Sequence, residues 1–283
     1  MKKPLIAVVV VLLMATLACS LQNIQMRTID PQIVFVSEPF PQTALETEIV
    51  FKMTGGKFIL TPDAQDFVSG SIKYNVEQWE PEFNRRDNYF EIRQANPFRL
   101  TGIPLGDIEN TWELALTESL PLNLTIEGGA SENEFDLSGL NLTRLRIIQG
   151  ASDTTLRFDK PNPGVMEDFA FTTGASSAKI FGLGNANFRR MTMSSGAGDY
   201  TLDFTGALQW DSMVDIKAGV SNISIIIPTG MNAVVVNNGT VSNVNTQGTW
   251  MVTDQTYSTL NEGYTLTINL NISVGNVNLI HEE

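Results

Sequence analysis

The amino-acid sequence predicts an all-β fold, a solenoid-like stack of β layers with an N-terminal hairpin inserted into the repeat. Two observations predict it. A small residue recurs along the chain with alternating apolar residues on both sides, and after residue 20 no stretch keeps the 3.6-residue apolar period of a helix. The recurring small residues, here called anchors, are Gly55, Ala130, Ala151, Ala175, Ala197, Val220, Val241 and Val274.

The apolar residues around each anchor keep a period of two. In the unit around Ala175, Phe169 and Phe171 precede the anchor by six and four positions, and Ala178 and Ile180 follow it by three and five. This period is the spacing of a strand with one buried face. From Ala130 to Val241 the anchors recur every 21 to 24 residues, which indicates stacked copies of one unit. Seven or eight such layers make a body about 35 Å tall.

We expect the anchors to mark sharp turns in a crowded interior, because a glycine precedes or follows most of them. Bulky side chains would then not fit at these positions. On this interpretation, replacing Ala175 or Ala197 with Leu overpacks the interior at a cost of about 1–3 kcal/mol.

A mostly polar residue stands two positions after each anchor. Stacked layers would align these residues into a ladder of Asx-type turns, with the asparagines hydrogen-bonded between layers. The alternative interpretation is a calcium-binding edge built from oxygen ligands. The few carboxylates among them favour the structural interpretation; the residues are Lys57, Glu132, Asp153, Ser177, Asp199, Asn222, Asn243 and Asn276.

The beginning of the chain has the features of a secretory signal, because Lys2 and Lys3 precede an apolar run over residues 5–17. The run ends at Cys19, the single cysteine, so no disulfide can form within one molecule. The segment resembles the lipobox of bacterial lipoproteins, with Thr16 where Leu is usual. We therefore expect removal of residues 1–18 and acylation of Cys19, which would hold the chain at the outer face of the bacterial cytoplasmic membrane.

Four segments are expected along the chain. After the signal peptide (1–18), residues 19–47 form a tether whose apolar stretch 33–36 can dock on the domain, residues 48–121 form an N-terminal β unit, and residues 122–281 form the repeat stack. In the N-terminal unit, residues 69–76 and 89–93 are expected to be two strands of the inserted hairpin, joined by the polar stretch 77–88. Residues 111–117 predict a further strand, and residues 246–262, with Trp250 and Tyr257, predict a loop or extra hairpin.

The composition excludes several kinds of chemistry. The net charge of −13 at pH 7 disfavours nucleic acid and anionic lipid as partners. His281 is the single histidine and is expected to be exposed, so catalytic arrangements that need a histidine and zinc sites built from several histidines are excluded. No spacing singles out two carboxylates as acid and nucleophile. Glycine pairs at 182–184 and 196–198 lack the following helix of a phosphate site. We expect no catalytic residue, cofactor or metal ligand.

Three segments resemble the bacterial toast-rack domains: Ser69–Val76, Leu122–Ala130 and Ser195–Phe204. The resemblance covers about residues 45–280. It groups the chain with the extracytoplasmic domains of cell-envelope stress proteins of the LiaF and LiaG type, and with domains labelled putative adhesins. It implies a stack of β layers with no cofactor and no catalytic residues, and it supplies no functional positions.

Three classes of function are consistent with the sequence. The first is a non-catalytic interaction or scaffold module in envelope maintenance or stress sensing, with other envelope proteins as partners. The second is an adhesin or carbohydrate-binding protein, which the four tryptophans suggest: Trp79, Trp112, Trp210 and Trp250. The third is a β-helical polysaccharide-active enzyme, which the scarcity of basic residues in the repeat disfavours.

The functional surface is expected in the irregular parts of the chain, because the regular residues hold the stack together. These parts are the insert at 77–88 and the loop at 246–262. An uncovered strand edge would favour a protein partner, and an open groove lined by aromatic residues would favour a sugar.

Overall fold

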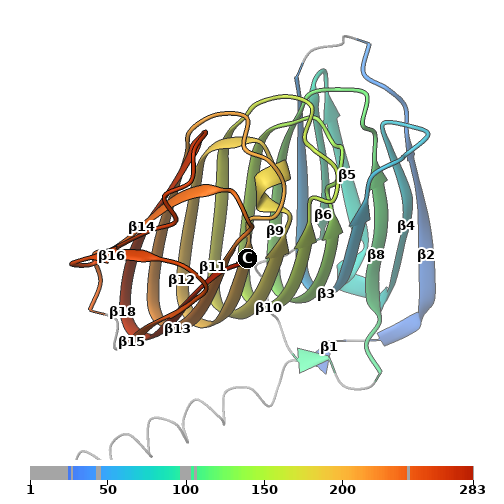
Figure 1. Ribbon diagram of the computed structural model, residues 1–283. Helices are drawn as coiled ribbons and strands as arrows, with labels where there is room; N and C mark the ends of the chain where they lie inside the picture. Colours follow the sequence, from blue (N-terminus) through green and yellow to red (C-terminus); the bar gives the residue numbers. More distant parts are fainter. Residues whose placement is uncertain are drawn as a thin grey trace, which may run out of the picture.

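The computed structural model describes residues 25–26, 28–42, 46–95, 103–104, 107–240 and 243–282. Within these residues the chain folds into a stack of β layers built on a 16-stranded sheet (Figure 1). Their helical structure is limited to two 3₁₀ turns, Glu77–Trp79 and Leu183–Asn185. No helix among them has the length and apolar character needed to cross a membrane. The predicted all-β layered fold is confirmed.

Seven long parallel strands form the body of the stack (Figure 1). Their pairing aligns the anchors of neighbouring layers, so that Gly55 lies beside Ala130, Ala130 beside Ala151, and Val220 beside Val274. In spatial order the strands are β3 (Thr47–Thr61), β9 (Leu122–Asp136), β10 (Leu142–Arg157), β11 (Met166–Phe181), β12 (Phe188–Asp203), β13 (Ser212–Ile227) and β18 (Thr265–His281).

The C-terminal end of the stack departs from sequence order. A layer of two short strands, β14 (Asn232–Asn237) and β15 (Asn243–Gln247), pairs with β18, so β18 is inserted between β13 and the layer that precedes it in the chain. The hairpin formed by β16 (Met251–Thr253) and β17 (Thr256–Ser258) extends the sheet beyond β14. This hairpin is the extra element expected within residues 246–262.

At the N-terminal end, β6 (Tyr89–Gln94) and β8 (Asn110–Leu116) both pair with β3 and together form one more split layer. The strand β4 (Val68–Val76) pairs with β8 and not with β6, so the expected hairpin partners are wrong. The inserted hairpin is instead β5 (Pro81–Arg86) with β6. The stretch 77–88 therefore contains a 3₁₀ turn and a strand of its own.

Part of the segment expected to be a tether belongs to the sheet. The strand β2 (Thr28–Glu38) pairs antiparallel with β4 and ends the sheet on this side. Val36 packs into the core, whereas Ile33 and Phe35 point outward. A separate two-stranded pairing joins β1 (Gln25–Met26) to β7 (Ile103–Pro104). The signal peptide and Cys19 lie outside the described residues.

Each long strand bends near its anchor, and the two halves, here called the first and second arms, enclose one hydrophobic core. Phe169 and Phe171 on the first arm of β11 are buried, and so is Ile180 on its second arm. Inward-facing residues stand an even number of positions before the anchor and an odd number after it. The pairing of neighbouring strands must therefore skip one residue at the corner. The pairing of Gln149 with Thr173 is followed by that of Ala151 with Ala175, which omits the glycine between them in both strands.

The described anchors from Ala130 to Val274 face solvent and Gly55 is half-buried, so the prediction that the anchors occupy a crowded interior is wrong; Val241 lies outside the described residues. Ala175 and Ala197 are exposed, and the side chain of Val220 is 61% exposed. The crowded position is the glycine one place earlier. A Cβ on Gly174 would lie 2.7 Å from the carbonyl oxygen of Gly150 in the neighbouring layer. The close approach of backbones at the corner explains the small residues, and Leu at either alanine would overpack nothing.

The core between the arms is mostly apolar, with an aromatic cluster toward the N-terminal end and a few buried polar side chains such as Asn133 and Thr154, which hydrogen-bond to each other. Phe58 on β3 lies at its centre and is 1% exposed. Its ring packs edge-on against Phe51, Trp112 and Phe135, with ring centroids 5.3 to 5.6 Å apart. Such contacts contribute beyond the apolar area they bury, so this cluster fixes β3, β8 and β9 relative to one another.

Candidate interaction surface

The outer face of the second arms carries two rows of side chains that run from β2 to β15. The sequence ladder forms most of the first row, so its alignment is confirmed. In spatial order this row is Ile33, Lys73, Thr111, Lys57, Glu132, Asp153, Ser177, Asp199, Asn222, Asn276 and Asn243. The second row is Phe35, Ser71, Glu113, Ile59, Glu134, Thr155, Lys179, Thr201, Ser224, Asn278 and Asn245.

Side-chain contacts between layers favour the structural interpretation of the first row, but its positions lie within strands, so the expected Asx-type turns are wrong. The Nδ2 of Asn222 donates to Oδ1 of Asp199 at 2.8 Å, and the Nδ2 of Asn276 donates to Oδ1 of Asn222 at 2.9 Å. Toward the other end, Nζ of Lys57 lies 2.7 Å from Oε1 of Glu134, and this hydrogen bond raises the pKa of Lys57. The described residues contain no group of three or more His, Cys, Asp or Glu side chains placed to hold a metal ion.

The strand β2 presents an uncovered edge at the N-terminal end of these rows (Figure 1). On the described chain, the side of β2 that faces away from β4 pairs with no strand. Ile33 is 54% and Phe35 81% exposed, which places two large apolar side chains beside unpaired backbone groups. Of the two surfaces considered from sequence, this is the one that favours a protein partner.

The inserted hairpin lies against the end of β2. Arg85 on β5 pairs with the carboxylate of Glu38 and donates a hydrogen bond of 3.0 Å to the carbonyl oxygen of Pro39. The irregular segment 77–88 therefore contacts the C-terminal end of β2. Residues 28–38 were missed because the alternation in this strand is broken by Pro31, and because Val36 is the one residue of the strand that is buried.

A partly buried ion pair fixes the other strand of this hairpin. The carboxylate of Glu91 on β6 is 3.1 Å from Nζ of Lys52 on β3, and Glu91 is 6% exposed. Burial alone would raise the pKa of Glu91, but hydrogen bonds with Lys52, Asn84 and Tyr89 lower it below its usual value. The same contact raises the pKa of Lys52, against the effect of its partial burial. The pair ties the hairpin to the stack.

The tryptophans do not gather on one face. Trp112 is fully buried in the aromatic cluster. Trp79 is half-buried beside Ile108 in a hollow of about 480 Å³ near the corner of β3. Trp250 is half-buried at the C-terminal end, where its Nε1 donates to the carbonyl oxygen of Gln247. A second hollow, of about 510 Å³, follows the corner from Lys52 to Ala151 and has no aromatic lining.

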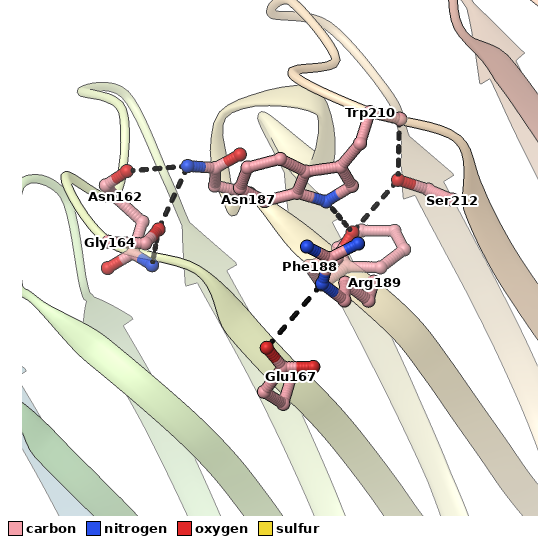
Figure 2. A network of polar contacts seen from close by, with 8 residues as sticks. All are labelled: Asn162, Gly164, Glu167, Asn187, Phe188, Arg189, Trp210 and Ser212. Atoms are coloured by element: carbon pink, nitrogen blue, oxygen red, sulfur yellow. Dashed lines mark hydrogen bonds and ion pairs between the residues drawn. The ribbon is translucent and has the colours of Figure 1, made fainter.

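Trp210 belongs to the loops that close the stack opposite the corner (Figure 2). Its Nε1 donates to the carbonyl oxygen of Phe188 at 3.0 Å, and the guanidinium of Arg189 lies over its ring at 5.0 Å. Arg189 also reaches Glu167, with Nε 3.5 Å from Oε1. These contacts hold the ring in the loop framework, so the tryptophans do not form the aromatic-lined groove that would favour a sugar.

His281 is half-buried and not exposed as expected. Its Nδ1 lies 2.9 Å from the carbonyl oxygen of Thr249, and its ring packs edge-on against Trp250 with centroids 5.9 Å apart. The histidine therefore fastens the segment that leads into the β16–β17 hairpin to the end of β18. Cys19, the expected lipidation site, lies outside the described residues.

Three solved structures are similar to this chain. A putative cell adhesion protein from Clostridium sporogenes is 18% identical, with 89% of this chain and 99% of that chain covered and a TM-score of 0.46. A putative adhesin from Bacteroides fragilis is 10% identical, with 90% of this chain and 100% of that chain covered and a TM-score of 0.38. A putative lipid binding protein from Parabacteroides distasonis is 6% identical, with 92% of this chain and 99% of that chain covered and a TM-score of 0.37. No curated protein matches the chain.

The family comparison is more decisive. The model for the N-terminal domain of toast_rack, DUF2154, matches residues 25–166, which is half of the sequence. The match contains β2, the inserted hairpin, β3 and the first long strands of the stack, so it includes the uncovered edge as well as the repeat. The chain belongs to the toast-rack family.

Proposed function

We propose that this chain is a lipid-anchored, non-catalytic interaction module at the outer face of the bacterial cytoplasmic membrane, acting in envelope maintenance or stress sensing. The observation that supports the proposal is the uncovered edge of β2 with Ile33 and Phe35 exposed. Unpaired N–H and C=O groups can bond to an added strand, and exposed apolar side chains select what that strand carries. The partner is an extended segment of another envelope protein.

A second copy of β2 fits this edge poorly. Antiparallel self-pairing centred on Val34 would place Asp30 opposite Glu38 and Pro31 opposite Ser37. Like charges directly opposite one another destabilise a strand pair, and proline has no N–H to donate. In this register Asp30 and Pro31 disfavour pairing of the edge with its own copy, while the stretch from Gln32 to Val36 stays accessible to a different partner.

The expected anchor would keep this edge near the membrane. Cys19 precedes Thr28, the first residue of β2, by nine positions. Because an extended chain spans at most about 3.4 Å per residue, β2 would begin within about 30 Å of the lipid. An edge held at that height meets proteins of the same membrane, and binding between tethered partners gains from their high local concentration.

The test uses the full chain in its native envelope with a photo-cross-linking residue at position 35. We expect one identified envelope protein to be cross-linked from position 35 and not from Thr201, a half-buried position of the same row. Phe35→Lys, installed with the cross-linker moved to Ile33, should remove that product. The proposal fails if the product is the same from both positions or survives Phe35→Lys.

The anchor is tested separately with Cys19→Ser. The wild-type chain should fractionate with membranes and carry acyl groups on its first mature residue, as read by mass spectrometry. The variant should carry no acyl groups and should be held by membranes less firmly than the wild-type chain, because the acyl chains are the anchor that the proposal assigns. Equal membrane fractions for both chains would contradict the lipid anchor and leave the strand-edge interaction to be judged by the cross-linking.

A further inference from the structure

The C-terminal part of the two outer rows is built from uncharged amide and hydroxyl side chains. On β13, β18 and β15 the six row positions are Asn222, Ser224, Asn276, Asn278, Asn243 and Asn245. We infer that these residues, here called the asparagine face, bind a neutral polysaccharide. The inference concerns a surface distant in the sheet from β2 and does not depend on the anchor or on the protein partner.

The stack itself does not require asparagine at these positions. The same rows on β3, β9 and β10 carry Lys57, Glu132, Glu134 and Asp153 on an identical parallel ladder. In that half, ion pairs between Lys57 and its two glutamate neighbours link the layers. Since one backbone geometry accommodates either set of side chains, the absence of charge from the asparagine face is a property of its surface chemistry.

The amides of this face are held in place by one another. Besides the bond from Asn276 to Asn222, Nδ2 of Asn245 donates to Oδ1 of Asn278 at 3.1 Å, and Nδ2 of Asn278 donates to Oγ of Ser224 at 3.3 Å. A carboxamide has two N–H donors and an oxygen with two lone pairs. Each row bond uses one donor, so fixed hydrogen-bonding capacity remains on the exposed side. Because these side chains are already ordered before a ligand binds, less side-chain entropy is lost on binding.

The spacing and charge of the face define the ligand class. Neighbouring layers lie about 4.8 Å apart and alternate residues of one strand about 6.7 Å apart, which makes a flat lattice of neutral donors and acceptors. Sugar hydroxyls donate and accept in the same way. The net charge of −13 disfavours polyanions, and a polycation would prefer the carboxylates at Glu132, Glu134 and Asp153. A neutral, hydroxyl-rich polymer remains the complementary partner.

The test is affinity electrophoresis of the purified full chain in detergent, in native gels containing a β-glucan, an α-mannan or a galactomannan, with alginate as the polyanion control. We expect retardation by at least one neutral polymer and none by alginate. Asn276→Asp should reduce the apparent affinity about tenfold or more, because it places a carboxylate at the centre of the face. Ser177→Asp adds the same charge to an exposed position of the same row on β11 and should change it less than twofold.

Thermal melting of each variant separates binding from folding. If Asn276→Asp unfolds, Asn245→Asp on the terminal strand β15 replaces it, since only β18 pairs with that strand among the described elements. Absence of retardation by all three neutral polymers, equal effects of Asn276→Asp and Ser177→Asp, or stronger binding to alginate would each overturn the inference. Because the assay contains no membrane and no partner protein, its outcome is independent of the proposed interaction at β2.

Discussion

At the corner of the stack, the structure predicts that the smaller of two substitutions destabilises the fold more, which is opposite to what residue size suggests. Gly174→Ala adds one methyl group next to the anchor, whereas Ala175→Leu adds a much larger side chain at the anchor itself. The structure places the first in contact with a neighbouring backbone and the second in solvent. The smaller substitution should therefore be the more destabilising.

The magnitude follows from the contact at Gly174. A Cβ there would lie 2.7 Å from the carbonyl oxygen and 3.5 Å from the carbonyl carbon of Gly150. These are backbone atoms, so two layers must separate, at an overpacking cost of about 1–3 kcal/mol. The reduced freedom of the unfolded chain returns about 0.4–1 kcal/mol. The net loss is at most about 2.6 kcal/mol and centres on about 1.3 kcal/mol, or about 3–5 °C in Tm for a domain of this size class. Ala175→Leu should stay within about 0.5 kcal/mol of the parent, as is usual for surface positions.

Thermal unfolding followed by circular dichroism, with urea midpoints measured in parallel, compares the two variants with the parent chain. Both thermal and urea unfolding are measured because a local shift at Gly174 can spread to adjacent layers, since the long strands are stacked in register. If Ala175→Leu lowers Tm as much as Gly174→Ala, or if Gly174→Ala melts with the parent, the assignment of the glycine column to the corner is incorrect.

Three further predictions concern the interior and the inserted hairpin. Phe58→Ala should cost about 3–5 kcal/mol in unfolding free energy, because a buried ring with three aromatic neighbours is lost; a loss below 1 kcal/mol would contradict this packing. Asn162→Ala should cost about 1–3 kcal/mol in the free energy of urea unfolding, since its side chain both donates to and accepts from the backbone of Leu142. An unchanged urea midpoint would contradict this role of Asn162. The lowered pKa of Glu91 means that its contribution is present above the unfolded pKa, near 4.3, and is lost as pH falls through the folded value. Glu91→Gln should therefore lower Tm more at pH 7 than at pH 3, and an equal loss at both values would show that the ion pair with Lys52 contributes nothing.

The repeat was accessible from the sequence because its signals are local. Alternation around Ala175 or Ala197 fixes which residues of each arm face inward, and equal spacing places equivalent positions side by side. The ladder from Glu132 through Asp153 to Asn222 follows from that spacing alone, whereas the place of Asn276 beside Asn222 depends on the insertion of β18 out of sequence order. Even so, the same pattern could not show whether the anchor faces the interior or the solvent. The inward-facing positions change from even to odd at the corner, where the strand pairing skips one residue.

Contacts between distant segments decided the candidate surface. Nothing local marks Phe35 as an exposed residue of a terminal strand, since this depends on the antiparallel pairing of β2 with β4 some 36 residues later. Likewise, Trp210 could have been a sugar platform until Arg189 and Phe188 were found to hold its ring.

The amino-acid sequence by itself therefore determined that the chain is a stack of β layers, which positions are buried along each arm, and which polar residues align across layers. These properties depend on periodicity, which a strand imposes on its own residues. Only the tertiary structure decided the order of the terminal layers, the exposed edge at β2 and the identity of the crowded corner residue. Those depend on which backbone lies opposite Gly174 or Phe35, and the neighbour is supplied by a different layer of the chain.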